Sequence, residues 1–243
     1  MHTERNGPDY RASDGSRWAH ALPASTANPL AGLNMQITCE ETTNTSRKWV
    51  LVLLLSAGLA MDYLVRLAPN SIFPILRVKL GVSDFELGLL VSVFLWTYGI
   101  LSPAAGFIGD RFSRRTVVIA AVAAWSVVTM LSAVVTRPWH FIVMRGVLGA
   151  AEVCFMPTAQ ALIADYHDDT TRSKAIGLFE VGAYCGIFLA GLPVAYSASR
   201  LGWRIMLLLC GVMGLMLAYI MHMSLPRTAN SERAADLWAP KYG

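Results

Sequence analysis

The run WVLVLLLSAGLAMDYLVRLA, residues 49–68, is almost entirely apolar; its two charged residues are Asp62 and Arg66. A helix needs about 20 residues to cross the hydrocarbon core of a bilayer, and this run is long enough. Apolar residues would lie on all sides of such a helix, whereas an amphipathic surface helix is apolar on one side only. We therefore interpret residues 49–68 as a membrane-spanning helix.

Five further runs of this kind follow along the chain. The six runs are Trp49–Ala68, Leu87–Phe107, Thr116–Val135, Phe141–Ala164, Ala175–Ala195 and Ile205–Met223. None of them alternates apolar and polar residues as the strands of a transmembrane barrel do. The composition agrees, because 55% of the residues are hydrophobic and only 15% are charged, against about 25% charged in soluble domains. The sequence predicts an all-α membrane protein with six transmembrane helices.

The two ends of the chain are polar. We expect a disordered tail over residues 1–47, a six-helix transmembrane domain over 48–225 and a second tail over 226–243. Near the span ends, ten Lys and Arg residues lie on the side of the tails and five on the other side. Cytoplasmic loops are enriched in Lys and Arg. Both termini are therefore predicted to be cytoplasmic, in an integral protein of the cell (inner) membrane.

Several other functional classes are disfavoured. The net charge of +4 does not indicate nucleic-acid binding, because the basic residues flank the spans instead of forming one block. The cysteines match neither a disulfide framework nor a zinc site. No histidine lies in the middle of a span, and no Gly-x-Ser-x-Gly nucleophile motif is present. We expect no cofactor, no metal and no enzymatic activity; the expected partners are membrane lipid, a small solute and a coupling ion.

The segment between the second and third spans reads Gly106-Phe-Ile-Gly-Asp110-Arg111-Phe-Ser-Arg114-Arg115. Retention of positive charge on the cytoplasmic side explains the arginines but not the aspartate. The segment resembles the signature loop of the major facilitator superfamily, G-x-L-x-D-R-x-G-R-R, with Ile for Leu and Ser for the inner Gly. In that family the loop is a cytoplasmic gate. The resemblance implies gating roles for Gly106, Asp110, Arg111, Arg114, Arg115 and Asp165, the last being an acid that pairs with the loop arginines.

Other motifs extend the resemblance over residues 49–226. Arg145-Gly-Val-Leu-Gly-Ala-Ala-Glu152 is similar to the start of the fourth helix in the organic-anion symporter and spinster-like branches. Gly202-Trp-Arg204 and Arg172-Ser-Lys-Ala175 are similar to the starts of their sixth and fifth helices. Their first helix often reads N-Y-L-D-R; here the Arg is kept as Arg66, and the acid stands at Asp62. The resemblance implies the amino-terminal six-helix half of a transporter, built as a three-plus-three inverted repeat.

The charges inside the spans are the candidate solute-binding and coupling residues. An ionised residue at mid-bilayer costs about 2.5–3.5 kcal/mol on insertion scales, so such residues should face the bundle interior and have partners. Asp62 and Arg66 are four residues apart and share a helix face. Arg145 and Glu152 are seven apart and also share one. We expect Glu152 to accept a proton during transport, although an interhelix hydrogen bond is the alternative role for these residues.

Three functions remain open at this point. The first is secondary transport of a small organic anion coupled to protons or sodium. The second, a membrane enzyme, lacks a metal or nucleophile constellation. The third is a truncated or partner half without transport of its own, because six spans are half the number usual in the family. One half alone would leave a polar face toward lipid, so a homodimer or a separate six-helix partner is expected.

Overall fold

The computed structural model describes the backbone of residues 29–225, and the side chains of that range except residues 29–45, 80 and 110. The chain divides into two units, residues 1–44 and residues 45–243. The first unit is helical over residues 29–44, because the first helix begins at Pro29. Part of the expected disordered tail is thus helical in the structure. The expected tail over residues 226–243 lies outside the described residues.

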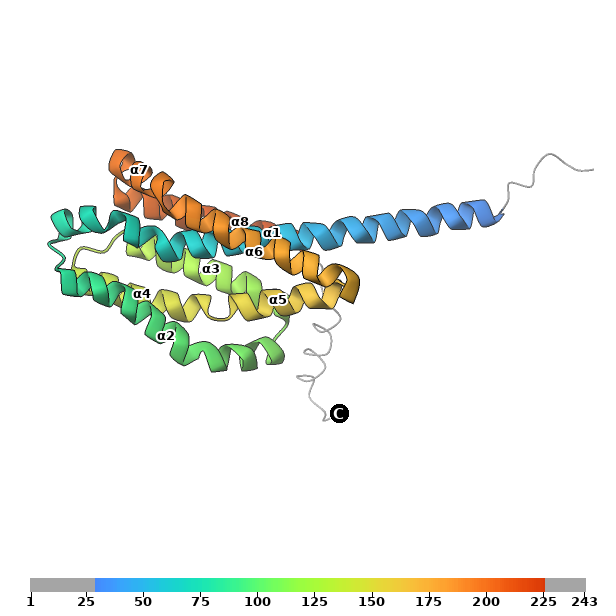
Figure 1. Cartoon of the computed structure of the whole chain (residues 1–243), viewed down its shortest axis with the longest axis horizontal. Coiled ribbons are helices and arrows are strands. Elements are labelled where there is room, and N and C mark those ends of the chain that lie inside the picture. The colour runs from blue at the N-terminus through green and yellow to red at the C-terminus, as the bar shows by residue number, and fades with distance from the viewer. Residues whose placement is uncertain (1–28, 226–243) are drawn as a thin grey trace, which may run out of the picture. The chain divides into compact units, whose positions relative to one another are not determined.

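Eight helices make up the described part of the chain (Figure 1). They are α1 (Pro29–Leu80), α2 (Asp84–Arg111), α3 (Arg114–Ser132), α4 (Pro138–Glu152), α5 (Phe155–Tyr166), α6 (Asp169–Ala190), α7 (Leu192–Leu201) and α8 (Trp203–Ser224). Six segments are long and apolar enough to cross a membrane: Ser46–Lys79, Asp84–Gly109, Arg114–Ser132, Pro138–Tyr166, Asp169–Ala190 and Trp203–Ser224. Each overlaps one of the six runs expected from the sequence, which confirms the prediction of an all-α fold with six spans.

The fourth and fifth spans differ in detail from the sequence prediction. The fourth is broken after Glu152, and α5 starts at Phe155. Pro157 accounts for the break, because proline has no N–H to bond the carbonyl of Val153 four residues earlier. The fifth span was expected to reach Ala195, but α6 ends at Ala190 and the chain continues as the separate short helix α7.

The first and fifth spans pack closely through two glycines. Gly182 and Gly186 of α6 face α1, and a Cβ at either position would overlap the backbone carbonyl of Ser56 or Ala60. The Ser56 hydroxyl also donates to the Leu178 carbonyl at 3.1 Å. The small-xxx-small spacing thus lets two backbones approach, as it does in other membrane helix pairs.

The remaining spans pair in the same manner. In α4, Gly146 and Gly149 pack against α2, and a Cβ on Gly149 would come within 2.8 Å of the Phe94 carbonyl. In α8, Gly211 and Gly214 pack against Ser126 of α3. The pairs are therefore spans 1–5, 2–4 and 3–6. In a three-plus-three repeat, spans 1, 2 and 3 correspond to spans 4, 5 and 6. Under this correspondence, pair 1–5 becomes pair 4–2 and pair 3–6 is unchanged, so the observed pairs fit such a repeat.

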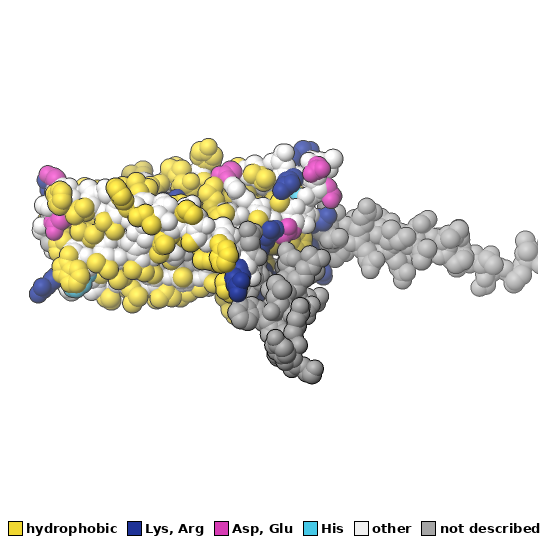
Figure 2. Space-filling model, turned by 90° about the horizontal axis from the view of Figure 1, so that it is seen from below, with side chains coloured by type: hydrophobic (Ala, Val, Ile, Leu, Met, Phe, Trp, Pro, Cys, Tyr) yellow, Lys and Arg dark blue, Asp and Glu magenta, His cyan; other side chains and the backbone are white. Residues whose placement is uncertain are grey.

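The outer surface of the six spans is apolar. Figure 2 shows hydrophobic side chains over the middle of the bundle and charged side chains gathered toward its two ends. Large apolar residues such as Trp96, Phe188 and Leu192 are 70%, 73% and 81% exposed. Apolar surface of this extent is a mark of a membrane or protein contact rather than of a surface in water. Together with the six spans, it identifies an integral membrane protein.

Candidate functional site

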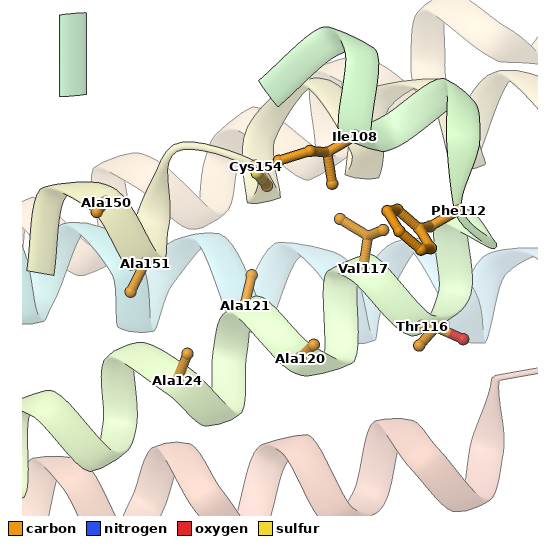
Figure 3. A pocket seen from close by; sticks show the side chains of 10 residues that line it. All are labelled: Ile108, Phe112, Thr116, Val117, Ala120, Ala121, Ala124, Ala150, Ala151 and Cys154. Atoms are coloured by element: carbon orange, nitrogen blue, oxygen red, sulfur yellow. The ribbon is translucent and has the colours of Figure 1, made fainter. Parts of the chain in front are cut away.

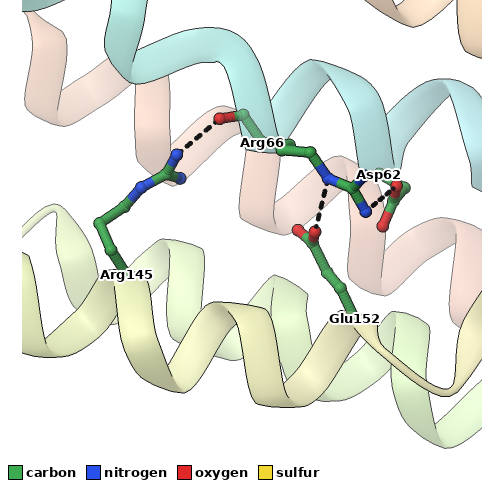
Figure 4. Close-up of polar contacts among 4 residues, drawn as sticks. All are labelled: Asp62, Arg66, Arg145 and Glu152. Atoms are coloured by element: carbon green, nitrogen blue, oxygen red, sulfur yellow. Dashed lines mark hydrogen bonds and ion pairs between the residues drawn. The ribbon is translucent and has the colours of Figure 1, made fainter. Parts of the chain in front are cut away.

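Four charged side chains from two spans meet inside the bundle (Figure 4). Asp62 and Arg66 lie one turn apart on α1, and Arg145 and Glu152 lie on the facing side of α4. These are the four residues expected to bind and couple, and we call them the charge cluster. The four residues and the pairing of Asp62 with Arg66 on one helix face were expected from the sequence; the contacts between α1 and α4 were not.

Arg66 is the centre of the charge cluster. Its Nη2 donates to Asp62 Oδ2 at 2.8 Å, and its Nε donates to Glu152 Oε2 at 3.1 Å. Arg145 does not pair with an acid in this way; its Nη2 donates to the backbone carbonyl of Arg66 at 2.7 Å. One guanidinium therefore bridges two carboxylates from different helices. A second guanidinium secures the backbone that carries the first.

Burial within the cluster is uneven. Asp62, Arg145 and Glu152 are 2%, 4% and 1% exposed, whereas the Arg66 side chain is 20% exposed. These three face the interior of the bundle, as expected of charges within spans, and this half alone does not leave them toward lipid. They neutralise one another within the bundle, because attraction between opposite charges is strong away from water. Arg66 is the most exposed member of the charge cluster.

Three buried polar atoms of the charge cluster have no hydrogen-bond partner among the described residues. They are Asp62 Oδ1, Glu152 Oε1 and Arg145 Nε. An unpartnered buried polar atom carries its desolvation cost uncompensated, so such atoms are frequent at functional positions. Each acid keeps one oxygen engaged by Arg66 and one oxygen available for a proton, a water molecule or a cation.

Aromatic rings surround the Arg66 guanidinium. Its central carbon lies 5.0 Å from the ring centroid of Tyr63, 5.2 Å from that of Phe94 and 5.1 Å from that of Tyr98. These distances are within the range of cation–π attraction. Phe94 was not among the residues singled out from the sequence. The available signal was that Phe94 precedes Tyr98 by one helical turn and shares its face.

At the far end of α2, the signature loop is held by its arginines. Arg114 pairs with Asp165 at 2.6 Å and also donates to the Ala161 carbonyl at 3.2 Å. Arg115 donates to the carbonyls of Leu225 and His222. The loop thus ties the start of α3 to the ends of α5 and α8. Gly106 and Arg111 lie exposed near the end of α2, and the Asp110 side chain lies outside the described residues.

Two cavities lie near this loop. An apolar groove of about 370 Å³ is lined by Phe112, Cys154 and five alanines of α3 and α4, among other residues (Figure 3). A smaller cavity of about 100 Å³ is lined by Gly106, Gly109 and Thr158, with Arg114 at its edge. No member of the charge cluster lines either of these cavities. The groove and the cluster are therefore separate features.

Two further findings concern ionisable groups. Glu180 accepts a hydrogen bond from Gln160 at 3.2 Å, between α6 and α5. Within the part of the chain whose side chains are described, no three His, Cys, Asp or Glu residues are grouped as metal ligands. Glu180 lies outside the charge cluster and has a neutral partner.

A family model described as Major Facilitator Superfamily matches residues 55–240. Among curated proteins, Protein spinster homolog 1 of Xenopus laevis is 28% identical over 164 residues, which is 65% of this chain and 31% of that protein. Protein spinster homolog 1 of Rattus norvegicus is 28% identical over 89% of this chain and 43% of its own length. The Sphingosine-1-phosphate transporter SPNS2 of Mus musculus is 28% identical over 63% of this chain and 29% of its own length.

A solved structure is also similar. It is the crystal structure of a bacterial homolog of the human lysosomal transporter Spinster, in an inward-facing and unoccupied conformation. The TM-score is 0.64 at 21% identity, over 75% of this chain and 44% of that one. The match confirms the fold. Both comparisons agree that the chain spans less than half the length of these relatives.

Proposed function

The chain belongs to the major facilitator superfamily, and on that footing we propose that it supplies six helices of a secondary transporter for a small organic anion, coupled to protons or sodium ions. In this superfamily the solute lies between two six-helix halves. The observation that carries the proposal is the position of Arg66, which is partly exposed and bonded to two buried acids.

The charge cluster supports coupled binding of an anion and a cation. A carboxylate or phosphate of the solute competes with Glu152 for the Arg66 guanidinium, which suits planar anions because of its paired donors. When Glu152 loses that contact, its charge is no longer balanced, so it takes up a proton or a sodium ion in the same step. Release of the solute restores the Arg66–Glu152 contact and expels the ion.

The class of solute is suggested by the relatives. SPNS2 is named as a transporter of sphingosine-1-phosphate, which joins a phosphate to an apolar chain. Aromatic side chains around Arg66 suit a ligand that combines an anionic group with apolar surface. We propose an amphipathic or small organic anion as the solute of this chain.

Transport in this fold requires twelve spans, so we propose that the chain acts with a second set of six, as a homodimer or with a separate partner. The arginine-rich loop between α2 and α3 supports a cytoplasmic position for that side of the bundle and for both termini, in the cell (inner) membrane. The signature loop, through Gly106, Asp110, Arg111, Arg114, Arg115 and Asp165, is proposed to gate that side.

A second candidate function is a half that does not transport by itself. The specific observation in its favour is that the matched region covers 29–43% of the three relatives named above. On this alternative the chain binds a partner half, or lacks activity because the facing half is missing.

The test is transport in liposomes. The full chain is reconstituted into vesicles loaded with the pH dye pyranine, and uptake of radiolabelled sphingosine-1-phosphate or lactate is followed under proton and sodium gradients. We expect gradient-driven uptake that Arg66→Gln removes and that the exposed control Arg77→Gln leaves unchanged. Uptake equal to that of protein-free vesicles under both gradients would count against transport by this chain and favour the half without activity.

A further inference from the structure

We propose that Phe94 is a positioning residue of the charge cluster: its ring holds Arg145 away from Glu152 and so leaves Arg66 as the cation that pairs with Glu152. Phe94 belongs to α2, which contributes no charge to the cluster. It is 3% exposed. The effect on transport rests on the proposed function above, but the contacts themselves do not.

Both arginines of the charge cluster contact the same ring. The central carbon of Arg66 and that of Arg145 each lie 5.2 Å from the centroid of Phe94. An aromatic face attracts a cation most strongly where water is excluded. The ring thus attracts two guanidinium groups, one from α1 and one from α4, and favours one position for each.

The ring also packs against the side of α4 that carries Arg145 and Glu152. Along α4, Gly149 lies between these two residues, at i+4 from one and i−3 from the other, so all three share one stripe of the helix. Gly149 has no side chain there, and the place of its missing Cβ is 3.5 Å from Cδ2 of Phe94. The Phe94 ring therefore fills the gap in the stripe between the two charges.

This arrangement explains a pair of unpartnered atoms. Arg145 Nε is a buried donor without a partner, and Glu152 Oε1 is a buried acceptor without one. Their residues carry opposite charges on the same face of α4, and a rise of about 1.5 Å per residue puts their Cα atoms only about 10 Å apart. Long side chains can span that distance. A direct ion pair between them is nevertheless not formed in the structure, and the Phe94 ring packs beside Gly149, on the stripe between the two residues.

Two further contacts keep Phe94 in place. Its backbone carbonyl lies 2.8 Å from the place of the missing Gly149 Cβ, so α2 and α4 pack closely at this point. Its ring packs against that of Tyr98 at 6.0 Å between centroids. Because Tyr98 also contacts Arg66, the two rings of α2 act as one surface against the cluster. The position of Phe94 is therefore set by α2 and α4 and not by the arginines it holds.

The consequence concerns how Glu152 gains and loses its partner. With Phe94 present, Glu152 depends on one guanidinium, and a solute that takes Arg66 leaves the acid free to accept an ion. Without the ring, Arg145 reaches Glu152 and stays bonded to it when Arg66 is withdrawn. The acid then remains ionised, and binding of solute is no longer linked to uptake of the ion.

The direct test does not require transport. Full-length protein labelled with ¹⁵N-arginine is studied by NMR, and the Nε signal of Arg145 is assigned by its loss in Arg145→Lys. In Phe94→Leu, which keeps an apolar side chain of similar size, we expect that signal to move as the Nε gains an acceptor. The movement should vanish in Phe94→Leu/Glu152→Leu, which has no acceptor at position 152. Phe94→Trp, which keeps an aromatic face, should leave the signal unmoved.

An Arg145 signal that is the same in folded Phe94→Leu as in the native protein would overturn the proposal. If Phe94→Leu does not fold, the native protein still provides a test. Nuclear Overhauser contacts are expected from the Phe94 ring protons to the side chains of both Arg66 and Arg145, and the absence of either contact contradicts the assignment.

Transport supplies a second readout. In Phe94→Leu we expect ion-driven turnover to fall about tenfold while the KM for the solute changes less than twofold, because the coupling step and not solute binding is lost. Phe94→Trp, which keeps the aromatic face, should keep most of the native turnover. Equal loss of turnover in Phe94→Leu and Phe94→Trp would indicate a packing defect instead. Failure of the native protein to transport would affect the proposed function alone, because the NMR result stands independently.

Discussion

Arg66 and Glu152 are 86 residues apart in the chain, yet Nε of one lies 3.1 Å from Oε2 of the other. The contact joins the first span to the fourth. It also places the partly exposed member of the cluster against its most deeply buried acid. Whatever binds Arg66 from outside therefore changes the surroundings of Glu152 directly, without an intermediate residue.

Replacing Glu152 should separate exchange from accumulation. Glu152→Gln keeps the size and hydrogen bonding of the side chain but cannot take up a proton or pair with sodium. We expect accumulation of solute against its gradient to be lost and counterflow exchange to persist. Both are measured in the same vesicle preparation. If accumulation survives, the coupling group lies elsewhere, and Asp62 is the next residue to replace.

Arg66 should not tolerate lysine. A lysine keeps the charge but lacks the two donors that bond Asp62 and Glu152 at the same time. We expect Arg66→Lys to lower solute uptake at least tenfold. Arg66→Gln should also lower stability by about 3 kcal/mol, because it leaves two buried acids without a cation. The melting temperature in detergent measures the second effect. Arg77→Lys is the matched control on the same helix, since Arg77 pairs with the exposed Asp84.

The signature loop should affect rate and not affinity. Asp165→Asn weakens the contact with Arg114, and Asp110→Asn tests the family motif in the same way. We expect both variants to slow transport several-fold while the Kd of the solute changes little. Asp168→Asn, which changes an exposed acid just beyond α5, is the control. Loss of solute binding with normal turnover in Asp165→Asn would contradict a gating role.

The close packing of α1 on α6 should leave no room for one added methyl group on a glycine at their contact. At Gly186 an added Cβ would overlap the backbone of Ala60, whereas at Gly177 of the same helix nothing lies within 4 Å. Gly186→Ala should destabilise the protein by about 1–3 kcal/mol. Gly177→Ala should have no such effect. Thermal unfolding in detergent compares the two, and equal melting temperatures would show that α1 and α6 can separate without cost.

The twelve-span proposal predicts a contact surface on α2 and α6, the helices that pack on α4 and α1. In a cysteine-free background, Trp96→Cys and Tyr184→Cys should crosslink to a second copy or to a partner in native membranes. Met216→Cys, on α8, should not. These three side chains are 70%, 72% and 60% exposed, so access to the reagent is similar. A protein that stays monomeric in membranes and still transports would refute the proposal.

The sequence predicted the spans and the charged residues because both are local properties. A run of apolar residues is visible in one segment, and Asp62 and Glu152 stand out in such runs by their charge. The contacts between the helices were not predictable in this way, because they depend on which faces of α1 and α4 meet. Phe94 was missed for the same reason: a phenylalanine in an apolar span has no local feature that indicates contact with two arginines.

The break after Glu152 shows a second limit. Pro157 was visible in the sequence, but prolines at 69 and 74 lie inside α1 without ending it. Whether a proline interrupts a helix in a membrane depends on what else bonds the freed carbonyl and on the packing around it. That information comes from neighbouring helices and not from the segment itself.

The division of the charge cluster between two helices bears on how the protein is made. The first span carries Asp62 with Arg66, and they pair within the helix at 2.8 Å. The fourth span likewise carries one base and one acid, Arg145 and Glu152. Each segment therefore carries no net charge from these residues when it enters the bilayer, and the first can do so before the fourth has been synthesised. Insertion and assembly need not coincide, because the Arg66–Glu152 bond between the helices adds to the Asp62–Arg66 pair within the first span.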